Sequence, residues 1–218
     1  MSAESTTLYY QALNRLVRER LGGLHSAQVL LWSVDFASIA QMQAADDWNQ
    51  AGEVLADAAK RLEVAGAQAI LICANTMHIV ADQVQSAVGV PLIHIADATA
   101  DAVKRAGCSR PLLLATRFTM EKDFYRGRLA AQGVAASVPD QADRDLLHAI
   151  IYDELCQGVI SPASKAQVLA MIAKAAGADC VIFGCTEIGL LLSPEDLSAP
   201  VVDTALVHAQ AGVDFALA

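Results

Sequence analysis

The chain has little positive charge and few aromatic residues. Its 218 residues hold 15 Lys and Arg against 24 Asp and Glu, which gives a formal net charge of −9. Because nucleic acids and anionic membrane surfaces attract clustered Lys and Arg, neither is an expected partner. Aromatic residues make up only 5% of the chain, so the core must consist mainly of Ala, Val, Leu and Ile. The sequence also lacks a membrane-length apolar run and a signal-peptide pattern, so we expect a cytoplasmic protein.

Paired cysteines are absent as well. The five cysteines are Cys73, Cys108, Cys156, Cys180 and Cys185. An odd number without a CxxC pair favours neither a disulfide framework nor a Cys-rich zinc site. No His and Glu spacing indicates another metal site. We therefore predict no metal, and we assign all of these cysteines except Cys185 to the core.

Apolar sequence is abundant, at 55% of residues, and it is arranged in short runs separated by amphipathic stretches. The runs typical of short buried strands are residues 28–34, 69–73, 91–95, 111–115, 133–138, 180–184 and 200–203. The stretches that predict helices are residues 8–21, 47–65, 119–132 and 146–176, the last broken at Ser161-Pro162. This alternation predicts an α/β fold with a parallel sheet and ligand sites at the carboxyl ends of strands.

The sequence also repeats itself. The stretch "AGAQAILICANT" (65–76) matches "AGADCVIFGCTE" (176–187) at an offset of 111 residues, about half the chain. A repeat of this length predicts two pseudo-symmetric, Rossmann-like halves whose strand-end loops meet across a cleft. We expect the first subdomain to span 1–96 plus 206–218 and the second to span 97–205.

The two predicted halves differ where they begin. In the second half an apolar strand precedes Thr116 and its helix, whereas in the register of the repeat Met1 falls near Thr116. Nothing in the sequence supplies the strand that should come before Met1. We therefore expect the first half to lack its first strand and to be marginally stable, unless another segment or a partner subunit fills the gap. Ser2 is then expected to be poorly fixed.

The polar residues Cys185, Thr186 and Glu187 directly follow the apolar run 180–184. A thiol of suitable pKa can remove a proton from a carbon acid and can return one to a carbanion. Thr186 and Glu187 are placed to adjust the pKa of the thiol, and Glu187 can also bind a substrate ammonium group. Cys185 is therefore the candidate acid/base.

The equivalent position of the first half carries Ala74 instead of a cysteine, followed by Asn75 and Thr76. Asn75 and Thr76 offer donors for a carboxylate or a developing enolate. Cys73 lies one position earlier and, on strand alternation, should point the other way. His78 fits either a place at the site or a capping or core role, while the other histidines show no partner in the sequence.

Several motifs closely resemble those of one family. They are "CANTMH" (73–78), "TRFTMEKDFYRGRL" (116–129), "FGCTEIGLLL" (183–192), "RLGGLHSAQVLLWSVDF" (20–36) and "HIADATADAV" (94–103). All resemble the aspartate/glutamate racemase superfamily, in particular its bacterial amino-acid racemase branch, and the similarity runs along the whole chain. The resemblance implies two α/β subdomains, no cofactor, commonly a homodimer, and removal and return of the Cα proton of a free amino acid.

The resemblance also assigns roles residue by residue. Cys185 matches the thiol of the C-terminal half. The positions that match substrate-holding residues are Asn75, Thr76, Thr116, Thr119 and Thr186; Lys165 falls where a basic residue is usual, and Ser2 falls in the family's opening loop. Two departures stand out. Ala74 replaces the first acid/base, and Ala44-Ala45 stand where members with acidic substrates carry Arg.

Three functions remain open on this reading of the sequence. The first is a cofactor-independent amino-acid racemase in which Cys185 is the surviving acid/base. The second is a one-thiol decarboxylase or lyase, for which Ala74 is the expected residue. The third is a catalytically silent amino-acid-binding protein that keeps the fold without the chemistry.

Overall fold

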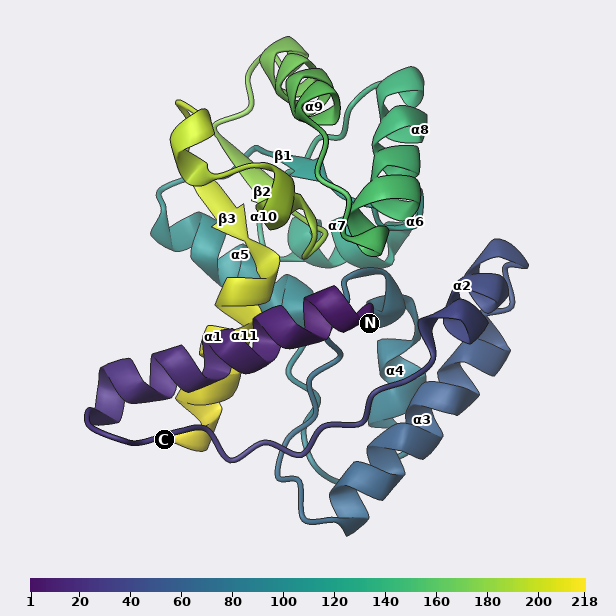
Figure 1. Cartoon of the computed structure of the whole chain (residues 1–218), viewed down its shortest axis with the longest axis vertical. Coiled ribbons are helices and arrows are strands. Elements are labelled where there is room, and N and C mark those ends of the chain that lie inside the picture. Colours follow the sequence, from purple (N-terminus) through teal and green to yellow (C-terminus); the bar gives the residue numbers. More distant parts are fainter. The chain divides into compact units, whose positions relative to one another are not determined.

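The computed structural model describes residues 1–218, and the chain divides into two compact units (Figure 1). Unit 1 comprises Met1–Ile95 together with His208–Ala218, and unit 2 comprises Ala96–Val207. The chain passes between the units at the start of α5 (Ile95–Arg105) and within α11 (Thr204–Ala216). None of the helices combines the length and the apolar character needed to cross a bilayer.

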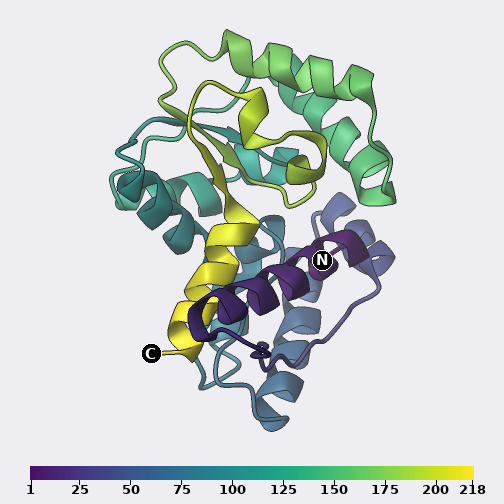
Figure 2. The ribbon, with the colours of Figure 1, turned by 60° about the vertical axis from the view of Figure 1, so that its left-hand side comes forward.

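Unit 2 is built around a three-stranded parallel sheet of order β1-β2-β3. In it β1 (Pro111–Leu114) pairs with β2 (Cys180–Phe183), and β2 pairs with β3 (Val201–Asp203). Every residue of β1 and β2 is buried, as is usual for parallel strands that are covered on both faces. Figure 2 shows β3 leading directly into α11. The predicted α/β class with a parallel sheet is confirmed.

A further segment pairs with the other edge of β1. Ser137, in the predicted strand 133–138, receives a hydrogen bond from the Leu113 amide at 2.8 Å and donates one to the Pro111 carbonyl at 2.9 Å. β1 is therefore hydrogen-bonded on both edges, as β2 is, so both are interior strands.

Two of the predicted helices of unit 2 are interrupted. The stretch 119–132 forms α6 (Arg117–Glu121) and α7 (Asp123–Ala131), and the stretch 146–176 contains several turns. Ser161 caps the last helix of that stretch, with Pro162 in its first turn, so the predicted break is confirmed. The elements from residue 141 to residue 196, strands aside, are α8 (Gln141–Ala149), the π turn η2 (Ile150–Glu154), η3 (Leu155–Gln157), α9 (Pro162–Lys174), α10 (Ile188–Leu191) and η4 (Pro194–Asp196).

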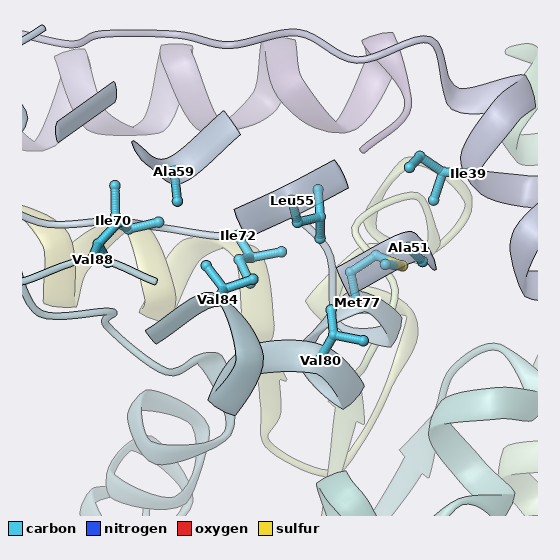
Figure 3. Packing of buried hydrophobic residues seen from close by; sticks show 10 residues of the cluster. All are labelled: Ile39, Ala51, Leu55, Ala59, Ile70, Ile72, Met77, Val80, Val84 and Val88. Atoms are coloured by element: carbon cyan, nitrogen blue, oxygen red, sulfur yellow. The ribbon is translucent and has the colours of Figure 1, made fainter. Parts of the chain in front are cut away.

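Unit 1 is mainly helical. Its elements before α5 are α1 (Ala3–Leu21), α2 (Phe36–Ala44), α3 (Trp48–Val64), the 3-10 turn η1 (Thr76–Val80) and α4 (Ala81–Gln85). Asp47 caps α3 by accepting a hydrogen bond from the Gln50 amide. Figure 3 shows the apolar core, in which Leu55 and Ala59 of α3 pack near Ile72 and Val84. This core covers one face of the segment 69–73.

The strands predicted in unit 1 are largely wrong. Segments 69–73 and 91–95 meet in a single parallel bridge, with the Ile70 amide donating to the Pro91 carbonyl at 2.9 Å. Segment 28–34 forms no strand, and Leu30, Leu31 and Trp32 are 49%, 56% and 47% exposed. The prediction failed there because an apolar run becomes a strand only when a neighbouring backbone pairs with it.

Ser2 is better fixed than the sequence predicted. It is only 4% exposed, and its hydroxyl caps α1 by accepting a hydrogen bond from the Ser5 amide at 3.0 Å. Its carbonyl accepts hydrogen bonds from the amide and the hydroxyl of Thr6. The expectation was wrong because the helix that follows is enough to hold this residue.

A group of buried histidines joins α1, η1 and α11 within unit 1. The His208 Nε2 donates to the Ile93 carbonyl at 2.7 Å, so Nδ1 accepts from the Tyr9 hydroxyl at 2.8 Å. The ring of His78 lies 4.5 Å from that of His94 and 5.6 Å from that of His208. Burial and the nearby His94 lower the pKa of His208 to about 4.

This lowered pKa predicts a loss of stability in acid. The unfolded chain takes up the proton near pH 6.5, whereas folded His208 stays neutral down to about pH 4. Stability is therefore full above pH 6.5 and falls as the pH drops toward 4, by ~3 kcal/mol in all. We expect His208→Gln to remove that slope while lowering stability at pH 7.

Urea unfolding of both proteins between pH 4 and 7.5 measures the difference. His25→Gln, at an exposed position, is the matched control and should keep the wild-type slope. An unchanged slope in His208→Gln contradicts the assignment.

Candidate functional site

The candidate site of unit 2 begins where β2 closely approaches β1. The Gly184 amide donates to the Leu114 carbonyl at 2.7 Å. A Cβ at Gly184 would lie 2.6 Å from the Leu113 side chain and 3.0 Å from the Ala115 Cβ, so only glycine fits there. The Thr204 hydroxyl also donates to the Phe183 carbonyl at 2.8 Å. The end of β2, and therefore the start of the loop at Cys185, is held on both sides.

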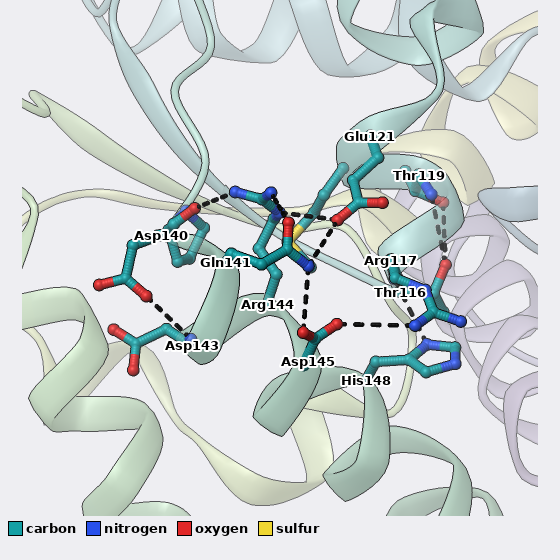
Figure 4. Close-up of polar contacts among 12 residues, drawn as sticks. Thr116, Arg117, Thr119, Glu121, Asp140, Gln141, Asp143, Arg144, Asp145 and His148 are labelled. Carbon is teal, nitrogen blue, oxygen red and sulfur yellow. Dashed lines mark hydrogen bonds and ion pairs between the residues drawn. The ribbon is translucent and has the colours of Figure 1, made fainter.

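The register of the two strands places predicted residues next to each other. Leu114 pairs with Phe183, so Thr116 and Cys185 occupy matching positions just beyond the strand ends. Thr116 caps α6, and its hydroxyl lies 3.3 Å from the hydroxyl of Thr119 (Figure 4). Both threonines are buried, at 6% and 0% exposure. Together the two hydroxyls can donate to one carboxylate group.

The side chains of Cys185, Thr186 and Glu187 meet at one carboxylate. The Cys185 thiol donates to Glu187 Oε2 at 2.9 Å, and the Thr186 hydroxyl donates to the same oxygen at 2.5 Å. All three residues are buried, at 9%, 5% and 4% exposure. Because a buried carboxylate is costly without donors, these hydrogen bonds offset the cost of burying Glu187 beside the thiol.

The thiol of Cys185 is held in its protonated form. Burial raises the pKa of Cys185 well above its ordinary value of 9.0, and the neighbouring Glu187 and Cys156 raise it further. In the resting protein the group is therefore a proton donor. Taking up a proton from a substrate requires the thiol to release its own first, and Glu187 Oε2 is the acceptor in contact with it.

Two residues near this carboxylate were missed in the sequence. Cys156, which we assigned to the core, donates to Glu187 Oε1 at 3.7 Å from η3. Tyr152, in the π turn η2, has its pKa raised by burial and by the charges of Cys185, Cys156 and Glu187. Tyr152 lies in a π turn and Cys156 in a short 3-10 turn, and neither kind of turn has an apolar period that marks it in the sequence.

His148 connects α8 to the start of α6. Its Nδ1 accepts a hydrogen bond from the Arg117 amide at 3.4 Å, and its ring lies 4.6 Å from that of Tyr152. Burial, followed by the charge of Arg117, lowers the pKa of His148. Figure 4 shows Arg117 also facing Asp145, at 3.6 Å. The loop that carries Thr116 is thus fixed from α8.

Lys165 is engaged elsewhere in unit 2. Its ammonium group forms an ion pair with Asp196 at 2.6 Å, between α9 and η4. The structure gives this lysine a local partner, so a role toward a substrate stays a prediction for Lys165.

Unit 1 gathers its predicted site residues at the end of segment 69–73. The terminal ammonium of Met1 and the hydroxyl of Ser5 both donate to the Cys73 carbonyl, at 2.6 and 3.1 Å. Ser2, between them, therefore lies at the same end of segment 69–73 as Asn75 and Thr76. These three residues are buried, at 4%, 4% and 7% exposure. Their contribution to substrate binding stays a prediction.

His78, four residues after Ala74, forms hydrogen bonds in the interior of unit 1. The His78 Nε2 accepts from the Ile95 amide at 3.2 Å, so its Nδ1 donates to the Ala74 carbonyl at 2.8 Å. His78 is only 2% exposed and takes the core role among the two that we considered. Burial raises the pKa of Cys73 to about 11, although the charge of the N-terminus lowers it in part. Cys73 is therefore a weak acid that rarely forms a thiolate.

One group of residues in unit 2 has the composition of a metal site. Ligand atoms of Cys108, Asp179 and Cys180 lie within 4.8 Å of one another. However, Asp179 already accepts hydrogen bonds from the Ser109 and Arg110 amides, and burial and Cys108 raise the pKa of Cys180 to about 12. The Asp179 carboxylate therefore holds the backbone just before β1, and the Cys108 thiol donates to the Asp179 carbonyl at 3.6 Å.

Comparison with known proteins agrees with this fold. The family model described as Asp/Glu/hydantoin racemase matches residues 1–212. The crystal structure of a candidate Asp/Glu racemase from Yersinia pestis is 50% identical, with a TM-score of 0.90, and the match covers 99% of this chain and 95% of that one. An aspartate racemase homologue from Pyrococcus horikoshii OT3 is 34% identical, with a TM-score of 0.85 and coverage of 99% and 95%.

A third relative is less similar in sequence. The broad-specificity amino-acid racemase RacX of Bacillus subtilis (strain 168) is 25% identical over 190 residues, which are 79% of this chain and 75% of that protein. The family match extends over nearly the whole sequence and includes Asn75 and Thr76 in unit 1 as well as Cys185, Thr186 and Glu187 in unit 2. The chain is therefore a member of the Asp/Glu/hydantoin racemase family.

Proposed function

We propose that the protein is a cofactor-independent amino-acid racemase in which Cys185 removes and returns the Cα proton. The hydrogen bond between the Cys185 thiol and Glu187 at the carboxyl end of β2 carries this proposal. It supplies both an acid, the thiol, and an acceptor for the thiol's own proton. Family membership supports chemistry at the Cα of an amino acid.

The proton balance follows from the contacts. For removal, the Cys185 proton passes to Glu187 Oε2 and the thiolate takes the Cα proton, which leaves a carbanion and a neutral thiol. For return, the thiol gives its proton to the carbanion, and the thiolate that remains recovers a proton from Glu187 Oε2, which restores the resting state. The negative charge that develops on the substrate carboxylate needs donors, and the Thr116 and Thr119 hydroxyls are placed to supply them. A return by Cys185 to the same face only exchanges the proton. Inversion needs a proton from the opposite face, where Ala74 offers no acid, and in this proposal water supplies that proton.

The substrate is best described as a small amino acid without a required acidic side chain. Ala44 ends α2 and Ala45 caps it, where racemases of acidic amino acids carry Arg according to the resemblance. No guanidinium is then available there for a second carboxylate. The broad specificity of the Bacillus relative fits this proposal. By the same resemblance we propose a homodimer, which sedimentation can measure.

A second candidate function rests on Ala74. A decarboxylase needs one proton donor on one face of the carbanion, so a single thiol suffices and yields a product of one hand. Loss of CO2 from malonate-like acids would favour this function. Exchange of the Cα proton in deuterated water, measured over a panel of amino acids, would favour the racemase. Stabilisation of the protein by an amino acid, without either reaction, would favour the catalytically silent amino-acid-binding protein.

Cys185→Ser is expected to abolish exchange. Serine keeps a donor for Glu187 but is a far weaker acid than cysteine, so we expect a fall of about 10²–10⁴-fold in Cα exchange. The free energy of unfolding should change by only about 1 kcal/mol, because the side chains differ by one atom. NMR of the Cα proton and urea unfolding measure the two effects.

Cys108→Ser is the matched control, since Cys108 and Cys185 are both 9% exposed. It should retain activity. Equal losses in the two variants mean that the effect is structural.

Glu187→Gln is expected to separate charge from hydrogen bonding. Glutamine keeps an acceptor for Thr186 and Cys185 but removes the negative charge that raises the pKa of Cys185. Alkylation of Cys185 should therefore become faster at a given pH, while Cα exchange should fall by about 10²-fold because the proton acceptor is lost. Peptide mass spectrometry follows the alkylation.

The exposed Glu195→Gln serves as control. Exchange that is unaffected in Glu187→Gln excludes Glu187 as the proton acceptor.

Ala74→Cys is expected to add the second acid/base. With one strong group, the wild type should exchange one enantiomer faster than the other, because a single thiol reaches one face of Cα. Cysteine at the repeat-equivalent position should raise the slower exchange and with it the racemisation rate. Initial exchange rates from the separate D and L amino acids give the ratio. Equal exchange rates of the two enantiomers in the wild type, together with no gain in Ala74→Cys, contradict the prediction that Cys185 serves one face alone. Ala74→Ser is the control for the size of the added side chain.

A further inference from the structure

Two thiols and a carboxylate of unit 2 meet at the end of β2 that is remote from Cys185. Cys180 is the first residue of β2, and Asp179 directly precedes it. Cys108 comes from the loop after α5, 71 residues before Asp179. The two sulfur atoms and a carboxylate oxygen of Asp179 all lie within 4.8 Å of one another. Because the three residues come from two distant segments, no cysteine spacing marks them in the sequence.

The backbone brings these two segments together. Gly107 follows α5 with a φ of 73°, and Gly177 follows α9 with a φ of 83°. Glycine adopts this left-handed conformation at little cost, so each chain turns sharply from its helix toward the sheet. The Asp179 amide then donates to the Arg110 carbonyl at 3.1 Å. The places of Cys108 and Asp179 are therefore set by the turns and by the pairing beside β1.

The Asp179 carboxylate is oriented by backbone donors. It accepts hydrogen bonds from the amides of Ser109 and Arg110, at 2.8 and 2.9 Å. Carboxylates that bind metals are commonly fixed by hydrogen bonds of this kind, and two oxygens with about four acceptor sites keep room for a cation. The ion pairs of unit 2 leave Asp179 without a Lys or Arg partner. The positive charge that would balance this carboxylate is therefore not supplied by a side chain.

The spacing of the three groups fits a small tetrahedral ion. Bond lengths of about 2.3 Å from Zn to sulfur and about 2.0–2.2 Å from Zn to oxygen place such ligand atoms about 3.5–3.8 Å apart. Atoms that lie within 4.8 Å of one another reach this spacing by side-chain rotations that move them about 1 Å. Cys108 and Cys180 are 9% and 0% exposed, whereas Asp179 is partly exposed. An ion can therefore enter past Asp179, and water can complete the tetrahedron there.

We propose that Cys108, Asp179 and Cys180 form a binding site for a thiophilic divalent cation of the Zn²⁺ class, with water as the fourth ligand. Two sulfur ligands select against Mg²⁺ and Ca²⁺, and the carboxylate favours a divalent ion over Cu⁺. Binding replaces the two thiol protons, which leave to solvent, and no electron is transferred. The ion joins the loop after α5 to the start of β2. It lies at the opposite end of β2 from Cys185, so the site is independent of the proposed chemistry.

Titration of the reduced full-length chain with Cd²⁺ tests the site, because Cd²⁺ bound to thiolates absorbs in the ultraviolet. We expect one bound ion with two protons released, and a Tm that rises by several degrees when Zn²⁺ is added. Loss of a group that only supports a ligand already weakens metal binding by about 10–100-fold, so Cys108→Ser should weaken it by at least about 100-fold. Asp179→Asn should weaken it by about tenfold or more, and Mg²⁺ should not compete.

Cys185→Ser and Cys156→Ser are the matched controls, since these two thiols also lie beside a carboxylate, that of Glu187. Both should keep the absorption band and the rise in Tm. Urea unfolding in the presence of EDTA checks that Cys108→Ser is folded. Binding that Cys108→Ser leaves unchanged, or that Cys185→Ser removes, overturns the proposal. So does a reduced chain that binds no Cd²⁺ and forms a disulfide between Cys108 and Cys180 in air, as read by peptide mass spectrometry.

Discussion

The close approach of β2 to β1 at Gly184 is the constraint on which the unit 2 site depends. A side chain at this position would collide with Leu113 and Ala115, and the hydrogen bond to the Leu114 carbonyl would open. Because the two strands end in register there, the residues that follow them emerge side by side. The Thr116 hydroxyl and the Cys185 thiol lie at the same edge of the sheet because residue 184 is a glycine and lets the two strands approach each other.

The arrangement of Cys185 and Glu187 disfavours the thiolate form of Cys185. A thiol and a carboxylate are buried together, and the negative charge of Glu187 opposes a second negative charge on Cys185. The pair is tolerated because Thr186 and Cys156 also donate to the carboxylate. The protein therefore keeps an acid that becomes a base only when a proton can move within the group, which limits unwanted reactions of a free thiolate.

The sequence predicted the parts of this structure that depend on local pattern. The apolar run before Gly184 identified β2 and the loop at Cys185, and the α/β class followed from the alternation of runs. Segment 28–34 was wrongly predicted to be a strand, because a pattern of apolar side chains does not show whether another stretch of backbone lies beside the segment and pairs with it. Cys156 donates to the carboxylate and Tyr152 feels its charge, and both residues lie in turns without an apolar period. Tyr9 and His208, 199 residues apart, pair only through the tertiary fold.

The two-part make-up of unit 1 affects how the protein is made. Residues 96–207 form a compact unit by themselves, whereas unit 1 needs residues 1–95 and the segment from His208 onward. On the ribosome the second unit can therefore fold first, although it is encoded later than most of the first. Tyr9 is synthesised 199 residues before its hydrogen-bond partner His208. Until His208 is synthesised, the apolar face of α1 is exposed in the nascent chain, where it can bind chaperones or aggregate.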